Sequence, residues 1–315
     1  NIPYQSNCNM SRVAVTGGAG YIGKEVVFNL LAKGYEVVVV DKVANPKIKN
    51  VHYKMVDLRT VTTSQALFRN CDYVIHLAAE VGGVEFANKF PATIITNNSL
   101  IDINTIRASY KCSIKKFVYV SSSLVYEQSK EFPLKEESTK KLPSPSLSYG
   151  FEKLFGESLC KAYFEENKLP YNICRLFNAY GKNSFGELDP HGHVIPDLIR
   201  KVRQSEGEVE IWGRKGISRS FTHVRDLAEG IVAALESKST VESFNIASGN
   251  EYTLEEIVLE IWQILQRKGK PKFKYIHNNR RDVMKNTASV SKSRALLGWR
   301  AKVPLRRGLI DMINS

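Results

Sequence analysis

The chain has 315 residues, of which 43% are hydrophobic, and a formal net charge of +13 at pH 7. This length suits one large α/β domain or two closely joined ones, and the apolar content is sufficient for a sizeable core. The sequence excludes a membrane helix, because no stretch approaches the roughly 18–20 consecutive apolar residues required. The five cysteines lack metal-ligand spacing and are odd in number, which predicts reduced thiols and a cytoplasmic protein.

The positive charge raises the question of nucleic acid as a partner. The lysines, however, are spread over predicted helices and loops and do not form one basic run with aromatic residues. We therefore expect neither a nucleic-acid nor a membrane partner. A mildly positive field would also attract a small phosphate-bearing ligand.

The first predicted strand, over residues 13–15, runs into a glycine-rich turn and then a helix over residues 25–33. In this turn Gly17 would permit a tight bend, Gly20 would let the backbone approach a pyrophosphate, and Gly23 would let the helix pack closely. The glycines are spaced three apart, with Tyr21 and Ile22 between the last two. Amide groups and the helix dipole would then bind phosphates. The unit predicts a dinucleotide site.

A second apolar strand, over residues 35–40, ends in Asp41. A carboxylate about twenty residues after the glycines accepts hydrogen bonds from the ribose hydroxyls of NAD and repels the additional phosphate of NADP. Lys42 weakens this repulsion, and a solvated loop acid is the plain alternative. Together with the glycine turn, Asp41 predicts NAD.

The next two predicted strands, over residues 52–56 and 73–77, are also followed by residues suited to binding a ligand at the carboxyl end of the sheet. Asp57, followed by Leu58, is expected either to contact the adenine amino group or to start a helix. Leu77 is followed by Ala78 and Ala79, whose small side chains would let the chain pass close to the cofactor.

A long helix is predicted from Pro91 to about residue 112. Its three asparagines, Asn97, Asn98 and Asn104, are unfavourable enough in a helix to suggest that some have partners. Asn98 is predicted to bind the cofactor.

A fifth strand, over residues 117–121, leads into Ser122, and a helix over residues 149–167 carries Tyr149 and Lys153. Residues four apart share one face of a helix, so the ammonium would lie near the phenol and lower its pKa. Ser122 could hydrogen-bond a substrate oxygen, while hydride passes between the substrate carbon and nicotinamide. A lone Tyr-x-x-x-Lys pair is usually an exposed helix pair. After a glycine turn and a serine-bearing strand, it predicts catalysis.

Regular alternation of strands and helices ends after the strand over residues 171–177. The alternation predicts an α/β fold with a Rossmann-type doubly wound parallel sheet and a smaller C-terminal substrate-binding lobe. We expect the sheet domain to span residues 10–178, completed by about 220–248 with a helix over 224–237 and a strand over 243–246. The lobe would comprise residues 179–219 and 249–315, with a helix over 194–203, a strand over 209–212 and a capping box from Thr253 to Glu256. A short strand and two short helices, with Trp299 between them, are expected after residue 270.

These motifs resemble those of the extended short-chain dehydrogenase/reductase family, in its NAD-dependent nucleotide-sugar epimerase/dehydratase branch. The resemblance covers nearly the whole chain and implies a tightly held NAD(P), a nucleoside-diphosphate sugar as substrate, and a homodimer joined by two helices from each subunit. The motifs that carry it are the glycine turn, Asp57-Leu58, His76-Leu77-Ala78-Ala79, Ser121-Ser122-Ser123, Tyr149 with Lys153, Arg175-x-Phe177-Asn178-x-Tyr180-Gly181, Arg219-Ser220-Phe221-Thr222-His223-Val224-x-Asp226 and Leu296-Leu297-Gly298-Trp299.

By position, the resemblance makes Ser122, Tyr149 and Lys153 catalytic. It further implies substrate contacts from Ser123, from Asn178 and Arg219 to the diphosphate, and from His193 and Val194 to the base. A surface ion pair is the alternative for Arg219, although arginine suits bidentate phosphate binding. The family's arginine three residues before the position of Asp282 is replaced by Asn279, which leaves Arg280 as a displaced candidate. His191 and His193 lack a third ligand nearby, so no metal site is predicted.

The two residues after Ser122 distinguish among the reaction types of this family. Family 4,6-dehydratases carry Asp-Glu there, decarboxylating relatives usually carry glutamate, and 3,5-epimerising relatives carry cysteine where this chain has Leu124. Leucine cannot transfer a proton, so C4 epimerisation and 4-keto reduction remain. Because a reductase more often uses NADPH, Asp41 favours a 4-epimerase acting on a UDP-hexose or UDP-uronate. A reductase of nucleoside-diphosphate 4-keto-6-deoxyhexoses is the alternative; a non-catalytic NAD-binding regulator is disfavoured by the intact catalytic set.

Overall fold

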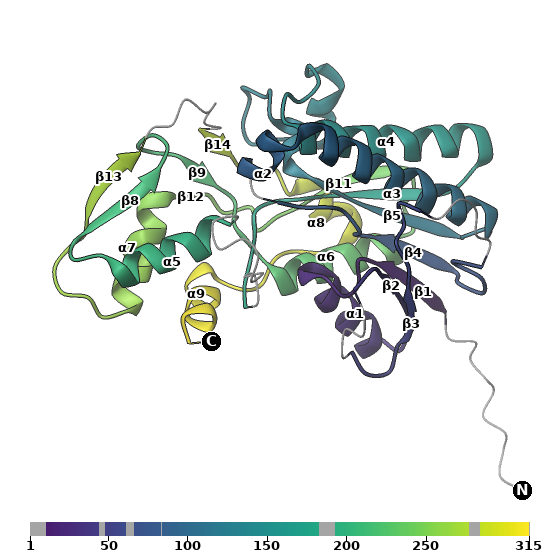
Figure 1. Cartoon of the computed structure of the whole chain (residues 1–315), viewed down its shortest axis with the longest axis horizontal. Helices are drawn as coiled ribbons and strands as arrows, with labels where there is room; N and C mark the ends of the chain where they lie inside the picture. Colours follow the sequence, from purple (N-terminus) through teal and green to yellow (C-terminus); the bar gives the residue numbers. More distant parts are fainter. Residues whose placement is uncertain are drawn as a thin grey trace, which may run out of the picture.

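The computed structural model describes residues 11–43, 48–60, 66–82, 84–182, 193–276 and 284–314. Its centre is a seven-stranded sheet in the order β11-β6-β5-β4-β1-β2-β3, in which every neighbouring pair is parallel (Figure 1). The predicted doubly wound α/β sheet is therefore confirmed, including the return of the strand near residue 244. The strands are β1 (Arg12–Thr16), β2 (Glu36–Asp41), β3 (His52–Met55), β4 (Tyr73–His76), β5 (Lys116–Ser122), β6 (Tyr171–Leu176) and β11 (Glu242–Ile246).

Helices cover both faces of this sheet. On one face lie α1 (Tyr21–Ala32) and α6 (Val224–Glu236); on the other lie α3 (Pro91–Lys111) and α4 (Ser148–Asn167) (Figure 1). Alternate strand residues serve the two cores: Val13 and Val15 pack with α1 and α6, whereas Ala14 belongs to the core under α3 and α4. Burial on both faces explains why these strands read as continuous apolar runs.

Two helices differ from the sequence prediction. Helix α1 begins at Tyr21 instead of residue 25, because Gly20 serves as its N-cap in an extended conformation and Gly23 lies in its first turn. The short helix α2 (Val84–Lys89) was not predicted. Among the described residues, none of the helices is both long and apolar enough to span a bilayer.

A second core lies beyond β6 and involves α5 (Val194–Gln204), α7 (Leu254–Ile264) and α9 (Leu305–Ile313). Its parallel pair is β8 (Glu208–Trp212) with β13 (Lys272–Ile276), and the predicted capping box at the start of α7 is confirmed. The remaining short strands are β7 (Ala179–Tyr180), β9 (Ser218–Arg219), β10 (Thr222–His223), β12 (Tyr252–Thr253) and β14 (Lys285–Asn286).

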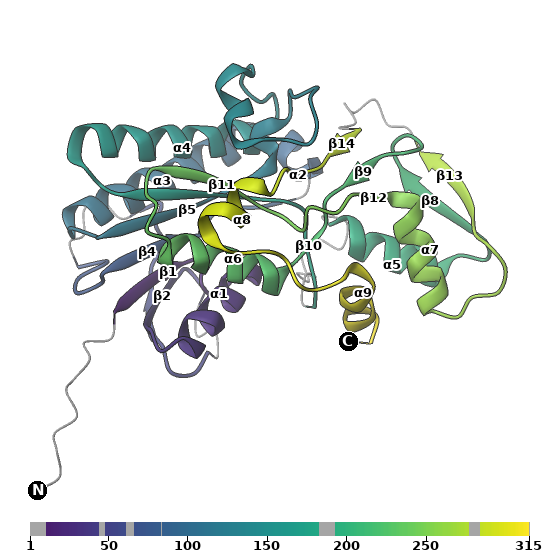
Figure 2. The same ribbon diagram turned by 180° about the vertical axis from the view of Figure 1, so that it is seen from behind.

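The C-terminal segment connects this second core with the sheet. Its helix α8 (Ser291–Leu297) packs against α6 and β11, and the chain then runs to α9 (Figure 2). The segment after residue 270 thus contains two short strands, β13 and β14, where one was predicted. The domain boundaries remain a proposal.

Candidate active site

A pocket of about 1230 Å³ opens at the carboxyl ends of the central strands and extends to residues of the second core. Most of the predicted site residues line it, from both parts of the chain. Asn98 does not line it, and Arg280 lies outside the described residues. The predicted residues in its wall are Gly17, Gly20, Tyr21, Ile22, Gly23, Asp41, Asp57, Leu58, Leu77, Ala78, Ala79, Ser122, Ser123, Tyr149, Lys153, Asn178, His193, Val194 and Arg219.

The turn between β1 and α1 has no room for side chains at two of its glycines. Gly17 has a φ of +69°, and a Cβ there would lie 2.7 Å from the backbone nitrogen of Ala78. A Cβ on Gly23 would lie 2.0 Å from the carbonyl oxygen of Gly17. The turn is therefore a bare backbone cradle with the positive end of the α1 dipole at the pocket wall, which fits the pyrophosphate of a dinucleotide.

Asp41 ties the end of β2 to this cradle. Its Oδ2 accepts a hydrogen bond from the N–H of Ala19 at 3.0 Å, and its Oδ1 accepts one from the N–H of Val43 at 3.2 Å. A carboxylate has about four acceptor sites, so the side chain retains capacity for ribose hydroxyls. A negative charge at this edge of the pocket fits NAD better than NADP.

Asp57 is held by its neighbour Arg59. The Arg59 Nη2 lies 2.6 Å from Oδ2 of Asp57 and its Nε 3.0 Å from Oδ1. This hydrogen-bonded pair lowers the pKa of Asp57 to about 2. The N–H of Thr60 donates to the carbonyl of Asp57, so a turn follows the acid over residues 58–60; residues 61–65, where the alternative helix would continue, lie outside the described residues. The adenine contact stays a prediction.

The three asparagines of α3 all have protein partners, as their position in a helix suggested. Asn98 is fully buried; its Oδ1 accepts from the N–H of Glu80 at 2.6 Å, and its Nδ2 donates to the Glu80 carbonyl at 3.1 Å. Asn104 donates to the carbonyl of Leu58, and Asn97 to the Glu80 carboxylate. Asn98 thus lies behind the cofactor-side wall and holds the loop after β4.

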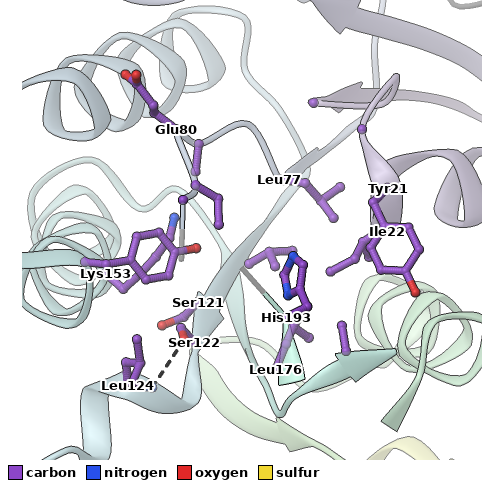
Figure 3. Close-up of a pocket in the computed structure, with 18 of the residues that line it drawn as sticks. Tyr21, Ile22, Leu77, Glu80, Ser121, Ser122, Leu124, Lys153, Leu176 and His193 are labelled. Carbon is purple, nitrogen blue, oxygen red and sulfur yellow. Dashed lines mark hydrogen bonds between the residues drawn. The ribbon is translucent and has the colours of Figure 1, made fainter. Parts of the chain in front are cut away.

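Tyr149 and Lys153 lie on one face of α4, with the Lys153 Nζ 5.6 Å from the Tyr149 ring centroid. Burial raises the pKa of Tyr149, and the Lys153 ammonium opposes this increase. Figure 3 shows Lys153 and Ser122 at the same side of the pocket, with Tyr21 and Ile22 across from them. This arrangement allows a phenol to exchange a proton with a ligand near Ser122.

Ser122 is oriented by the short 3-10 helix η1 (Ser123–Tyr126). Its Oγ accepts a hydrogen bond from the N–H of Leu124 at 3.2 Å (Figure 3), which leaves the hydroxyl hydrogen available to a ligand oxygen. Helix α4 packs directly on this segment, since a Cβ on Gly150 would lie 2.7 Å from the Leu124 carbonyl oxygen. The close packing brings Ser122 and Tyr149 to one wall.

The expected substrate residues come from several elements. Asn178 has a φ of +35° and its Nδ2 donates to the Ser220 carbonyl at 2.9 Å. Arg219 in β9 is half-buried, with its Nη1 donating to the Ser218 carbonyl at 2.9 Å. His193 is the N-cap of α5 and Val194 its first residue.

Several pocket residues were missed by the sequence analysis. Glu80 directly follows Ala79, a position that could have identified it. Trp212 ends β8 and is half-exposed, and Asn286 in β14 donates from its Nδ2 to the Oγ of Ser123 at 3.1 Å. Asn286 and Ser123 are far apart in the chain, so no local pattern predicts their contact.

A bare phosphate cradle at β1, an acid at the end of β2 and a Ser-Tyr-Lys set in the same pocket define a dinucleotide-dependent enzyme with a parallel α/β fold. The sequence matches the NAD dependent epimerase/dehydratase family over residues 13–247, and the chain belongs to that family. NAD, the cofactor predicted from Asp41 and the glycine turn, is the cofactor of this family.

Several known proteins are similar to this chain, in sequence or in structure, over most of its length. The chain is 28% identical to the GDP-L-fucose synthase of Sinorhizobium fredii over 312 residues, which covers 96% of this chain and 95% of that protein. It is 29% identical to the GDP-mannose 3,5-epimerase of Arabidopsis thaliana over 266 residues, 82% of this chain and 70% of that protein. The solved UDP-glucose 4-epimerase of Thermotoga maritima with UDP-glucose has a TM-score of 0.82 and 28% identity, covering 96% and 97% of the two chains.

Proposed function

We propose that the protein is an NAD-dependent nucleotide-sugar 4-epimerase that acts through a transient 4-keto sugar. The observation that carries this proposal is the composition of the catalytic wall: Ser122, Tyr149 and Lys153 line the pocket together with the aliphatic Leu124. Dehydration and 3,5-epimerisation both need a further acid or base near the sugar ring. C4 epimerisation and 4-keto reduction need only the three polar residues and the cofactor, and Asp41, which fits NAD, favours epimerisation.

In this reaction Tyr149 removes the proton of the sugar 4-hydroxyl, while the Lys153 ammonium stabilises the phenolate that must form. The Ser122 hydroxyl donates a hydrogen bond to the same substrate oxygen. NAD, which the glycine turn and Asp41 would hold, would supply the hydride acceptor and donor when bound. Tyr149 finally returns the proton to the same oxygen, and the product sugar has the oxidation state of the substrate, so no external oxidant or reductant is consumed.

On the substrate side, Arg219 and Asn178 are proposed to contact the diphosphate, with Ser123 near the sugar. Arginine forms bidentate hydrogen bonds with phosphate, and Arg219 lines the pocket from the second core. His193 and Val194 are proposed to contact the base, and the role of Arg280 stays a prediction from the sequence.

The similarity to a GDP-mannose 3,5-epimerase and a GDP-L-fucose synthase widens the substrates to be tested. Leu124 argues against 3,5-epimerisation itself, because its side chain has no group that can carry a proton. The names of these relatives nevertheless make GDP-hexoses candidates of equal standing with the UDP-hexoses and UDP-uronates favoured by the sequence.

The test is incubation of the purified protein with UDP-, GDP-, CDP- and dTDP-sugars without added cofactor, followed by chromatography and mass spectrometry. A new peak of unchanged mass that isotope-labelled substrate identifies as the C4 epimer supports the proposal. Reduction of a 4-keto sugar with NAD(P)H, without epimerisation of any sugar, would instead identify a reductase. Loss of water or carbon dioxide, or a change at C3 or C5, would show that the role assigned to Leu124 is wrong.

A further inference from the structure

Behind Lys153, buried polar side chains form a continuous chain of hydrogen bonds from α4 to β1. The Tyr119 hydroxyl donates to Oδ2 of Asp102 at 2.6 Å, and Oδ1 of Asp102 lies 2.9 Å from Nε2 of His76. The Nδ1 of His76 lies 2.6 Å from the Thr16 hydroxyl. All four side chains are at most 1% exposed, and the proposed reaction uses none of them.

The chain of hydrogen bonds determines the protonation of His76. A carboxylate only accepts, so Nε2 donates to Asp102 and Nδ1 accepts from the hydroxyl of Thr16. Burial lowers the pKa of His76, which agrees with a neutral ring. Thr16 in turn accepts from the N–H of Ala78 at 3.4 Å, so the chain ends at the cofactor-side wall.

Tyr119 separates a buried cation from a buried anion. Its hydroxyl accepts from the Lys153 Nζ at 3.4 Å while it donates to Asp102, and the Nζ lies 5.0 Å from its ring centroid. Burial opposes ionisation of Asp102, but Lys153 and the bond from His76 lower its pKa. The carboxylate therefore bears the negative charge that balances Lys153.

A second acid, Glu152, is fully buried beside this group, with its Oε2 3.9 Å from the Lys153 Nζ. Burial raises the pKa of Glu152 to about 8, with Asp102 adding to the increase and Lys153 opposing it. These influences favour the protonated form of Glu152. With Glu152 protonated, the buried group contains one cation, Lys153, and one anion, Asp102, and no uncompensated charge.

The position of Tyr119 requires a glycine in α4. A Cβ on Gly156 would lie 2.0 Å from the Tyr119 hydroxyl oxygen and 2.3 Å from Oδ2 of Asp102. The hydrogen-bonded pair therefore occupies the space that any other residue at this position would fill. Helix α4, which carries Tyr149 and Lys153, therefore packs closely on Tyr119 and Asp102 at Gly156.

We propose that Tyr119 and Asp102 are positioning residues for Lys153: the hydroxyl of Tyr119, fixed by Asp102, keeps the ammonium from pairing directly with Asp102 and holds it beside the Tyr149 ring. Opposite charges attract strongly in a low-dielectric interior. Without the hydroxyl, the ammonium is drawn toward Asp102 and away from the phenol whose ionised form it stabilises. This inference rests on the proposed role of Tyr149 and Lys153.

The test compares Tyr119→Phe with Tyr126→Phe in the full chain saturated with NAD. Tyr126 is also buried, donates to Asn245 and accepts from Arg175 at 2.7 Å each, and does not line the pocket. Titration of ¹³Cζ-tyrosine by NMR, with the Tyr149 signal assigned from Tyr149→Phe, gives the ionisation midpoint directly. We expect this midpoint to rise by about one pH unit in Tyr119→Phe, because the phenolate loses its cation, and to stay unchanged in Tyr126→Phe.

A double variant tests the cause of the shift. In Tyr119→Phe/Asp102→Asn the anion that attracts the ammonium is gone, so the Tyr149 midpoint should lie below that of Tyr119→Phe. An unchanged midpoint in Tyr119→Phe, an equal shift in Tyr126→Phe, or a double variant titrating no lower than Tyr119→Phe would overturn the inference. The titration needs no substrate, so it decides this point even if the wild-type chain epimerises no nucleotide sugar.

Discussion

Tyr149 is the side chain on which the proposed chemistry depends most directly. Replacement by phenylalanine removes the proton-transferring hydroxyl and keeps the ring that packs beside Lys153. General acid–base catalysis typically contributes 10²–10⁴-fold, so we expect kcat to fall about 1000-fold with NAD still bound. Turnover and the NAD content of the purified variant measure the two effects. Activity within tenfold of wild type would remove Tyr149 from the mechanism.

Asp41 is the side chain that decides between the two nicotinamide dinucleotides. Its carboxylate lies at the end of β2 and accepts from the glycine turn. We expect Asp41→Ala to lower the preference for NAD over NADP at least tenfold, because the ribose loses an acceptor and the repulsion of the additional phosphate disappears. The ratio of the two dissociation constants, measured by calorimetry, tests this. Replacement of the exposed Lys24 on α1 by alanine provides a control that should leave the ratio unchanged.

The residue scale is also where sequence reasoning was least complete. It grouped Ser122, Tyr149 and Lys153, which do line one pocket, because their chemistry and spacing are local, and their catalytic roles stay a proposal. It assigned Asn98 to the cofactor side, whereas the amide holds the backbone of Glu80 behind the pocket wall. The hydrogen bonds joining Thr16, His76, Asp102 and Tyr119 link residues from four separate elements, so only the folded chain brings them together.

At the scale of elements, the long strands and helices were predictable because their apolar periodicity is strong and their ends carry clear signals. The start of α1 was predicted four residues too late, since glycines lower helix propensity although Gly20 caps this helix. The two-residue strands β7, β9, β10, β12 and β14 have no periodicity of their own. They exist through pairing with distant segments, which no local pattern specifies.

Helix α4 gives a prediction at this scale. In Gly156→Ala the added methyl would collide with the Tyr119 hydroxyl and with Asp102, at 2.0 and 2.3 Å. Alanine favours a helix by about 1 kcal/mol over glycine. Overpacking and a broken buried hydrogen bond each cost about 1–3 kcal/mol. We expect a net destabilisation of about 2 kcal/mol, measured by urea unfolding.

The control for Gly156→Ala is Ser158→Ala, an exposed position on the same helix. It should change the free energy of unfolding by no more than about 0.5 kcal/mol. A Gly156→Ala variant as stable as wild type would mean that Tyr119 and Asp102 can move apart without loss, and the close packing of α4 on this pair would have no energetic importance.

At the scale of the whole molecule, α3 and α4 lie side by side on one face of the central sheet, and α1 lies on the opposite face (Figure 1). Leu100 and Tyr110 on α3 and Phe151 on α4 are large apolar side chains that are 40–43% exposed. The family resemblance implies a dimer formed by two helices from each subunit. We propose α3 and α4 as those helices.

A charge on this face should therefore separate the subunits. In a two-fold dimer each substitution occurs twice in one interface, so Leu100→Glu would bury two carboxylates without partners and weaken the dimer at least tenfold. Size-exclusion chromatography with light scattering measures the mass. Phe28→Glu is the matched control, because Phe28 on α1 is 50% exposed on the other side of the sheet. A monomeric wild-type protein, or dissociation by both substitutions alike, would contradict the assignment of α3 and α4 as the dimer interface.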